Sequence, residues 1–390
     1  MSDDSDTTTD GPTRRDTLKY GSALAAGGAV AGCSSLLNGD STQETATPGG
    51  GSYSVTMAPT GEVTFDSVPD RWAPYCGAFA DMGVALGHGD TMTGGGNLDE
   101  FYTYVYDEIP GVSAPSDAIE SHPEVRSKEA FYELDNDVHF YDPAMLINWF
   151  DWSQRDITEI SENVGPFLGN LIFRRSDDWH DHRYYTLYEA FEKVAQVFQE
   201  QDRYRAFERF HDEFIARIQS NLPPVSERPD VLLTYENTAE PETFSPYRLT
   251  DLGTSKKQWR DLGVGDALSG TGIENLSTTN RGELDYETLL EVDPDVILVR
   301  GHERKSPAEF RDVVLDYMRD HPVGSELTAV QNGRVYRGGY LHQGPVHNLF
   351  LTERAAQQLY PDQFGRVTGD EELFDRQRVA DIINGDIDDA

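Results

Sequence analysis

The chain has 390 residues, of which 69 are acidic and 32 are basic, so its formal net charge is −37. This balance excludes a nucleic-acid-binding protein, because the cationic side chains that neutralise phosphate groups are missing from the chain as a whole. Hydrophobic residues make up 37% and aromatic residues 11% of the chain, so it can build hydrophobic cores and is not simply disordered. The length predicts about two domains or lobes.

The acidic excess is accompanied by few lysines. Six lysines and 26 arginines make up the 32 basic residues. This composition resembles that of proteins from extreme halophiles, in which concentrated salt screens the self-repulsion of an acidic surface. The net charge therefore indicates that the protein works in concentrated salt, and it does not identify a binding partner.

The N-terminal segment has the pattern of an export signal. Arg14 and Arg15 precede an apolar, Gly- and Ala-rich run over residues 20–32. This run is too short for a membrane-spanning helix, which needs about twenty residues, and its four glycines disfavour a buried helix. The arginine pair resembles a twin-arginine signal, which exports folded proteins.

The export signal ends in a pattern typical of lipoproteins. Val-Ala-Gly-Cys at residues 30–33 resembles a lipobox, in which cleavage before the cysteine frees its thiol for lipidation. The sequence predicts a signal peptide over residues 1–32, a lipidated Cys33, and a Ser/Thr/Gly/Pro-rich tether over residues 33–52. The mature chain is expected on the extracellular face of the cytoplasmic membrane. Cys76 then remains as the other cysteine, which excludes an intramolecular disulfide and predicts a small buried residue.

Two segments of the remaining chain repeat one another. Residues 127–143 and 285–301 each begin a helical turn with a Glu, reach Asp-x-Asp, and run into an apolar strand. In each segment the Glu lies eight positions before the second Asp, from Glu129 to Asp137 and from Glu287 to Asp295. Gly-rich turns precede both segments, at residues 82–94 and 262–272. Two repeated features in the same order predict two similar α/β lobes.

Helix-forming sequence without Gly or Pro lies between these lobes. Residues 184–201 carry apolar side chains at helical spacing, and a second amphipathic stretch over residues 202–221 begins at a plausible N-cap, Asp202. The second stretch would span roughly 30 Å as a helix. We therefore expect an N-terminal lobe over residues 53–201, a bridging helix over 202–221, and a C-terminal lobe over 222–390.

Together these features resemble the substrate-binding lipoproteins of ABC importers that serve iron–siderophore complexes, haem and cobalamin. The similarity covers roughly residues 53–385 and is strongest in the second lobe. Its hallmarks there are residues 289–299 (LLEVDPDVILV), residues 327–336 (LTAVQNGRVY) and Gly344-Pro345. One departure is residues 71–77 (RWAPYCG), where the family usually has a Ser/Thr-rich helix start and a Glu.

The resemblance implies a fold of two α/β lobes, each a three-layer sandwich with a largely parallel sheet, joined by a single long helix. It implies a monomer without a cofactor that captures a metal chelate between its lobes and delivers it to an ABC permease and ATPase. An iron(III)–siderophore complex is the expected ligand, with cobalamin and then haem as alternatives.

Ligands of open α/β sheets bind beyond the carboxyl ends of the strands. Arginine side chains suit an anionic chelate, and tryptophan and tyrosine rings suit a macrocycle or a catecholate. Local pairing, such as Arg175 with Asp177 or Asp178, is the alternative for each arginine. The predicted ligand-contacting residues are Trp72, Tyr75, Arg174, Arg175, Trp179, Tyr235, Arg300, His302, Tyr340 and His342.

A structural metal site is not expected. His180 and His182 lie at i and i+2, which places them on opposite faces of a strand and apart on a helix. The sequence contains no zinc-binding Cys or HExxH pattern. Direct metal binding with help from His302 and His342 stays open.

An enzyme is the alternative from another functional class. The sequence contains no GxSxG, Ser-x-x-Lys or phosphate-binding GxxxxGK[ST] motif, and carboxylate pairs carry no information in so acidic a chain. A secreted enzyme is therefore a distant alternative, and we expect no catalytic residues.

The repeated glutamates have a role in the family that the sequence resembles. A glutamate in that place on each lobe contacts arginines of the permease, which implies docking roles for Glu129 and Glu287. The alternative is that both are acidic residues favoured near helix N-termini by the helix dipole.

Overall fold

The computed structural model describes residues 51–249, 251–273, 276–277, 280–367 and 371–387. The predicted export signal with Arg14 and Arg15, the lipidation site Cys33 and most of the tether lie outside these residues. Among the helices that are described, none combines the length and the apolar character needed to cross a bilayer.

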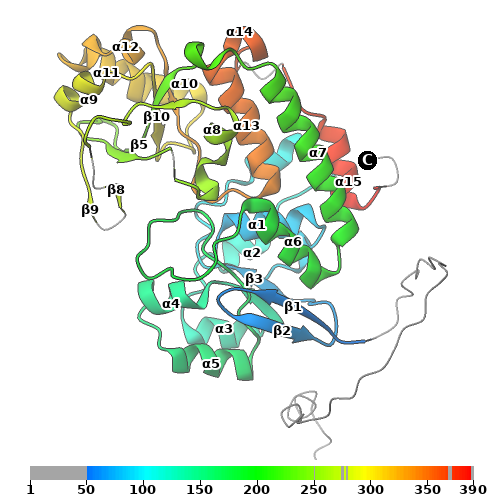
Figure 1. Ribbon diagram of the computed structural model, residues 1–390. Helices are drawn as coiled ribbons and strands as arrows, with labels where there is room; N and C mark the ends of the chain where they lie inside the picture. The colour runs from blue at the N-terminus through cyan, green and yellow to red at the C-terminus, as the bar shows by residue number, and fades with distance from the viewer. Residues whose placement is uncertain (1–50, 250, 274–275, 278–279, 368–370, 388–390) are drawn as a thin grey trace, which may run out of the picture. The chain divides into compact units, whose positions relative to one another are not determined.

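The first lobe is built around short parallel strands. β3 (Trp72–Pro74) pairs in parallel with β4 (Val138–Phe140), and single bridges to Met92 and Phe167 extend this sheet at both edges. An antiparallel hairpin of β1 (Tyr53–Met57) and β2 (Gly61–Phe65) precedes the sheet. The helices of this lobe are α1 (Gly77–Ala85), α2 (Ser116–Ser121), α3 (Lys128–Leu134), α4 (Pro143–Trp149), α5 (Gln154–Asn163) and α6 (Leu187–Phe198) (Figure 1).

A twenty-residue helix, α7 (Gln201–Ser220), follows the first lobe. It was predicted at residues 202–221 and is displaced by one residue at each end. One face buries Phe207, Phe210 and Phe214, because apolar residues recur there at helical spacing. α7 packs beside α13 (Pro345–Leu359) and α15 (Arg376–Asn384), as Figure 1 shows.

The second lobe contains a larger, mostly parallel sheet. Its strands are ordered β11-β10-β5-β6, with β7 paired to β5. β5 (Asp230–Tyr235), β10 (Val296–Arg300), β11 (Val335–Arg337) and β7 (Gly265–Asp266) run parallel, whereas β6 (Ser245–Tyr247) is antiparallel. β8 (Leu276–Ser277) and β9 (Asn280–Arg281) form a separate antiparallel pair.

The remaining helices of this half are short. They are α8 (Lys257–Asp261), α9 (Tyr286–Val292), α10 (Pro307–Phe310), a π-helical turn at Arg311–Leu315, α11 (Asp316–Asp320), α12 (Thr328–Gln331) and α14 (Pro361–Phe364). Short 3-10 segments occur at Gly89–Thr91, Thr103–Glu108, Val225–Glu227, Thr254–Lys256 and Gly324–Glu326.

The second sheet is buried on both faces. Leu233 and Leu298 contribute to a core that continues through α7 and α13 into the first lobe. Leu232, Ile297 and Val299 pack into a separate cluster on the opposite face. Because side chains alternate across a strand, this division makes the sheet the middle of three layers. The chain therefore has the α/β, helix-bridged two-lobe fold that its sequence predicts.

The internal repeat corresponds to equivalent helix–turn–strand units, α3–β4 and α9–β10. Both helices have seven residues and begin at a side-chain N-cap, Ser127 in one and Asp285 in the other. Both end at an aspartate in the left-handed conformation, Asp135 with φ 44° and Asp293 with φ 40°. Aspartate tolerates this conformation better than most residues, which explains why Asp-x-Asp follows each helix.

The second aspartate of each Asp-x-Asp fixes the strand that precedes the unit. Asp137 Oδ2 accepts the backbone N–H of Arg71 at 3.0 Å, beside the start of β3. Asp295 Oδ2 accepts the backbone N–H of Asp230 at 2.9 Å, at the start of β5. The repeat is therefore a packing unit in which one carboxylate aligns two neighbouring parallel strands.

A buried carboxylate joins α1 of the first lobe to α13. Asp81 Oδ2 accepts the backbone N–H of His347 at 3.0 Å, and Oδ1 accepts the hydroxyl of Tyr106. Gly344 permits this close approach, because a Cβ there would lie 2.5 Å from Asp81 Oδ2 and 2.6 Å from the carbonyl oxygen of Ala78. Burial raises the pKa of Asp81, against the lowering effects of His347 and Tyr106.

Candidate ligand-binding site

A cavity of about 800 Å³ lies at the carboxyl ends of the strands of the first lobe. Tyr75 follows β3, and residues 173–174 and 176–179 follow the bridging segment at Phe167. Leu341 and His342 reach the same cavity from the chain that follows β11. Both halves of the fold therefore contribute to its wall.

Four of the predicted ligand-contacting residues line this cavity: Tyr75, Arg174, Trp179 and His342. Their aromatic rings meet edge to face. The Tyr75 and His342 rings are 6.4 Å apart at 86°, and Trp179 lies 5.7 Å from Trp149 at 89°. Such contacts hold the rings in fixed orientations and leave flat apolar faces along the wall.

Arg174 is positioned by two contacts. Its Nε and Nη2 each donate to Asp177 at 2.6 Å, and its guanidinium lies 4.4 Å from the centre of the Trp149 ring. Both contacts are favourable for a partly buried guanidinium. Arg174 therefore forms the local ion pair with Asp177 that the sequence analysis considered for Arg175.

Arg175 lies outside this cavity. Its guanidinium is 5.0 Å from the centre of the Tyr184 ring, and its Nε is buried with no hydrogen-bond partner among the described residues. Arg174 and Arg175 therefore do not share one site.

His342 is a buried, neutral imidazole at the cavity wall. Burial, together with the charges of Arg174 and Arg300, lowers its pKa to about 3. Its Nε2 lies 3.5 Å from Asn97 Nδ2 and 3.6 Å from Glu100 Oε2. Burial raises the pKa of Glu100, and Arg300 partly opposes this. The wall thus presents a neutral ring beside a carboxylate that protonates more readily than usual.

Trp72 belongs to the core rather than to the cavity. Its side chain is 0% exposed, packs edge to face on Phe140 and Phe198, and donates from Nε1 to Thr91 and to the carbonyl of His88. It starts β3 instead of preceding it, so its side chain points into the lobe.

The remaining predicted residues occupy separate places in the second half. Buried Arg300 donates to the carbonyl groups of Gly338 and Ser255. His302 Nε2 is 3.3 Å from Glu236 Oε2 in a buried pair. The structure does not bring these groups into the cavity described above.

Tyr235 and Tyr340 also lie away from this cavity. Tyr235 ends β5 and accepts a hydrogen bond from Asn237 at 3.0 Å. Tyr340 is buried, and its ring is 4.7 Å from that of Tyr102. Tyr235 is thus the last residue of β5 and Tyr340 follows β11, but neither side chain lines the cavity.

Sequence reasoning missed Asn97, Glu100, Trp149 and Asp177, which also line the cavity. The Gly-rich turn at residues 94–96 was the available signal for Asn97. A Cβ at Gly96 would lie 2.7 Å from the Tyr75 ring, so glycine is needed there to bring Asn97 beside β3.

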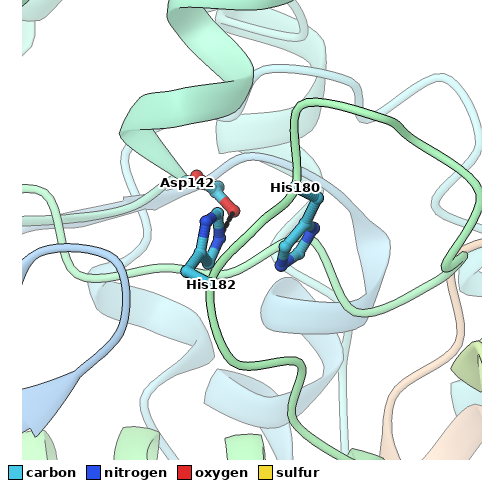
Figure 2. Close-up of side chains that lie close together, drawn as sticks. All are labelled: Asp142, His180 and His182. Carbon is cyan, nitrogen blue, oxygen red and sulfur yellow. Dashed lines mark hydrogen bonds and ion pairs between the residues drawn. The ribbon is translucent and has the colours of Figure 1, made fainter.

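The prediction that His180 and His182 lie apart is wrong. Their rings stack with centroids 3.8 Å apart, and Asp142 Oδ2 lies 3.0 Å from His182 Nε2, as Figure 2 shows. The segment is neither helix nor strand but a loop with a turn at Asp178–Trp179. The spacing rule for regular elements therefore does not apply to it.

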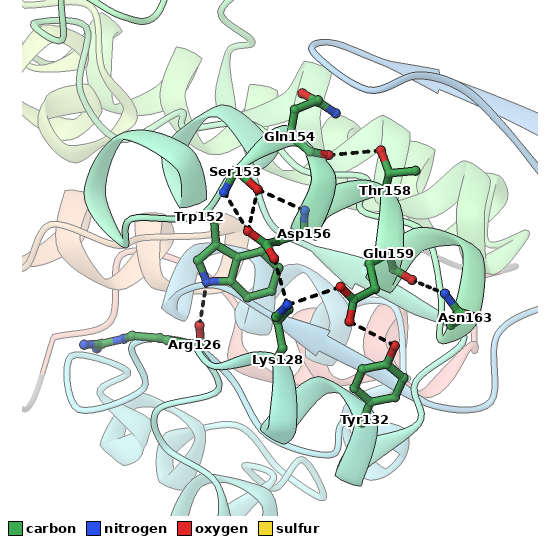
Figure 3. A network of polar contacts seen from close by, with 10 residues as sticks. All are labelled: Arg126, Lys128, Tyr132, Trp152, Ser153, Gln154, Asp156, Thr158, Glu159 and Asn163. Carbon is green, nitrogen blue, oxygen red and sulfur yellow. Dashed lines mark hydrogen bonds and ion pairs between the residues drawn. The ribbon is translucent and has the colours of Figure 1, made fainter.

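The helix that carries Glu129 is firmly anchored. Lys128 precedes Glu129, and its Nζ forms ion pairs with Asp156 at 2.8 Å and with Glu159 at 3.2 Å, both on α5 (Figure 3). Tyr132 adds a hydroxyl contact to Glu159 at 3.4 Å. These contacts hold α3 against α5 while Glu129 stays exposed.

Glu129 and Glu287 are each the second residue of their helix, and both are exposed. The backbone N–H of Glu129 and the hydroxyl of Ser127 lower the pKa of the Glu129 carboxyl, so it is ionised at neutral pH. The two glutamates therefore occupy equivalent places on equivalent units of the two lobes.

Comparison with known proteins agrees with this architecture. Residues 161–339 match the family model described as periplasmic binding protein. No curated protein sequence matches the chain. A periplasmic binding protein from Veillonella parvula is 18% identical with a TM-score of 0.55, and the match covers 79% of this chain and 97% of that one.

Two further solved structures are similar. The petrobactin-binding protein YclQ from Bacillus subtilis is 14% identical with a TM-score of 0.55, over 80% of this chain and 99% of that one. The iron uptake ABC transporter substrate-binding protein PiuA from Streptococcus pneumoniae is 14% identical with a TM-score of 0.54, over 80% and 100%. Residues 161–339 thus resemble the periplasmic binding protein family, and the helix-bridged two-lobe fold of the chain is that of these structures.

Proposed function

We propose that this protein is the extracytoplasmic substrate-binding subunit of an ABC importer and that it captures an iron(III)–siderophore complex. The observation that carries the proposal is the 800 Å³ cavity at the strand ends, which both halves of the fold line with aromatic rings and one arginine. Two of the similar structures are of a petrobactin-binding protein and an iron uptake protein, which supports an iron chelate as the ligand.

The chemistry of the wall fits an anionic chelate with flat rings. Trp149 and Trp179 offer aromatic faces, and Arg174 offers a permanent positive charge in an otherwise acidic protein. Asp177 neutralises part of that charge in the absence of ligand, so a catecholate or carboxylate oxygen has to compete with it. The ligand therefore gains most from Arg174 if its own charge exceeds that of one carboxylate.

Native mass spectrometry of protein purified from its own host tests this assignment. An iron-containing siderophore mass supports the proposal. A co-purifying corrinoid or haem would instead assign the cavity to the alternative ligands, and turnover of a substrate would assign it to an enzyme.

Substitutions at the Arg174–Asp177 pair should change affinity in opposite directions. Arg174→Ala should weaken binding of the ferric chelate by about 1.5–3 kcal/mol, because a charge-assisted hydrogen bond is lost. Asp177→Asn should strengthen binding, because the competing carboxylate is removed. Fluorescence titration measures both. Arg175→Ala is the matched control and should leave affinity unchanged; equal affinities in all three variants would refute the anionic-chelate assignment.

We also propose that the chain is exported by the twin-arginine route and held at the membrane by a lipid on Cys33. Cys33→Ser should release folded protein into the medium, because the lipid is the proposed attachment. Arg14→Lys with Arg15→Lys should retain the precursor inside the cell. Fractionation of cells that lack the permease measures both effects, and a Cys33→Ser protein that stays with the membrane would contradict the lipid anchor.

Docking to the permease is proposed to use Glu129 and Glu287. The support is their equivalent place on the two repeated units, which suits a transporter with two similar halves. Because an exposed ion pair contributes little in concentrated salt, the surrounding shape has to contribute as well.

A further inference from the structure

Three metal-ligating side chains lie together behind the wall of the cavity. Asp142 is the N-cap residue of α4, and His180 and His182 come from the loop that precedes α6 (Figure 2). One potential ligand atom from each residue lies within 4.8 Å of the other two. This arrangement uses none of the groups that line the proposed chelate site.

His180 is the unusual member of this group. It is 7% exposed, yet both of its ring nitrogens lack a hydrogen-bond partner among the described residues. Buried polar side-chain atoms nearly always have a partner, and a side chain with two unsatisfied nitrogens indicates a missing ligand. A metal ion bound to one of these nitrogens would supply such a ligand.

Asp142 is fixed in a position that suits coordination. Its Oδ1 accepts the backbone N–H of Ala144 at 2.9 Å, and its Oδ2 accepts that of Leu171 at 3.0 Å. His182 Nε2 lies 3.0 Å from the same Oδ2. Two of the three ligand atoms are therefore already adjacent, and backbone contacts hold the carboxylate.

We propose that Asp142, His180 and His182 bind a divalent transition-metal cation of the Zn²⁺, Co²⁺ or Ni²⁺ type. The ion replaces the hydrogen bond between His182 Nε2 and Asp142 Oδ2, and neutral His182 then carries its single proton on Nδ1, exchanged through solvent. Two imidazoles with one carboxylate favour such ions over Mg²⁺ and Ca²⁺, which prefer oxygen ligands. Water completes the coordination at an open position.

The step from the present geometry to a bound ion is small. Metal–ligand bonds of about 2.0–2.2 Å place ligand atoms roughly 3–3.5 Å apart, so separations within 4.8 Å have to shrink by at most about 1–2 Å. His180 supplies this movement, because its ring is held by stacking against His182 and Tyr184 and by no hydrogen bond among the described residues.

The site ties a cavity-lining loop to a cavity-lining helix. His180 directly follows Trp179, and Asp142 is the N-cap of α4, which ends at Trp149; both tryptophans line the cavity. A bound ion therefore fixes the relative positions of these two rings from behind, without contacting the chelate. This role is independent of which ligand the cavity takes.

Isothermal titration of the EDTA-stripped full chain with Zn²⁺ tests the proposal. The buffer contains molar KCl and millimolar Mg²⁺, because an acidic surface otherwise collects cations without a specific site. We expect one equivalent of Zn²⁺ to bind. His180→Ala and His182→Ala should each weaken zinc binding by at least about tenfold. Mutating a residue that only hydrogen-bonds to a metal ligand already weakens binding about that much. His122→Ala, at a partly exposed histidine of the same lobe, should not weaken zinc binding.

Zinc binding that survives in the His180→Ala/His182→Ala variant, or that salt and Mg²⁺ abolish, would overturn the proposal. If the variants do not fold, zinc X-ray absorption spectroscopy of the unchanged protein tests the proposal. The site requires two imidazole ligands, so a spectrum without them would refute it. Chelate binding by the stripped protein is measured separately, so a failure of this site and a failure of the proposed transport function give different results.

Discussion

The Glu129→Ala/Glu287→Ala variant should bind the ferric chelate with unchanged affinity, but cells that carry it should no longer take up the chelate. Both side chains are exposed, and neither residue lines the cavity, so their loss leaves the proposed ligand site intact. Docking should fail because each lobe loses its proposed contact with the permease. Uptake of labelled ferric chelate by whole cells, beside a titration of the purified variant, measures the two effects.

The repeat supplies a matched control for this experiment. Glu133 and Glu291 lie four residues further along the same two helices and are also exposed. Glu133→Ala/Glu291→Ala removes the same charge from the same units, so it should transport normally. If both double variants transport at the normal rate, the docking proposal fails; if both are inactive, net charge rather than position is responsible.

Glu303→Ala should destabilise the fold by about 3 kcal/mol or more. Glu303 is 3% exposed and bonds to Arg354 on α13 at 2.9 Å and 3.2 Å, while Gly339 donates its backbone N–H to the same carboxylate at 2.8 Å. Removing one partner of a buried ion pair leaves the other charge without compensation, which typically costs about 3–5 kcal/mol. Chemical unfolding at constant salt measures the loss. Glu291→Ala on the surface is the control, with an expected change within about 0.5 kcal/mol.

The same pair gives a predictable pH dependence. Burial alone would raise the pKa of Glu303, but Arg354 and Arg337 outweigh it, so the pKa is lowered in the folded protein. A lowered pKa contributes stability above the unfolded value of about 4.3 and loses it as the pH falls through the folded value. Glu303→Gln should remove this acid-dependent part of the free energy of unfolding. An unchanged acid limb in that variant would show that other carboxylates control it.

The repeated units were predictable because local sequence determines them. Each is a seven-residue helix with a capping residue, an aspartate that tolerates the left-handed conformation, and an apolar strand, and all of these signals lie within seventeen residues. The bridging helix was predicted within one residue for the same reason. Periodicity and capping are local properties, so one sequence reveals them.

Trp72 shows where local reasoning failed. β3 has three residues and ends in proline, which hides the strand from a pattern search. Without that strand, Trp72 reads as a loop residue near a ligand, although its partners Phe140 and Phe198 lie far along the chain. Tyr75, directly after the same strand, and His342, in the chain after β11, do line the cavity, in agreement with the general rule for strand ends.

The histidine pair was missed for a different reason. His180 and His182 were judged by the periods of regular structure, whereas a turn within the loop sets their positions. The third member, Asp142, lies about forty residues away in sequence, and nothing in a single sequence reports that proximity. Clusters that depend on loop conformation and on distant residues therefore require coordinates.

The contacts of Asp81 affect how the proposed importer subunit can release its ligand. Separating α1 from α13 would pull the carboxylate from the backbone N–H of His347 inside a core from which water is excluded. Removing one hydrogen-bond partner from a buried polar group costs about 1–3 kcal/mol, and each 1.4 kcal/mol is about a tenfold loss in population. The two lobes are therefore expected to keep their relative position rather than to swing apart on thermal energy. In the proposed importer, the work that releases the ligand has to be supplied from outside the molecule, by the nucleotide cycle of the transporter, whereas ligand capture requires diffusion alone.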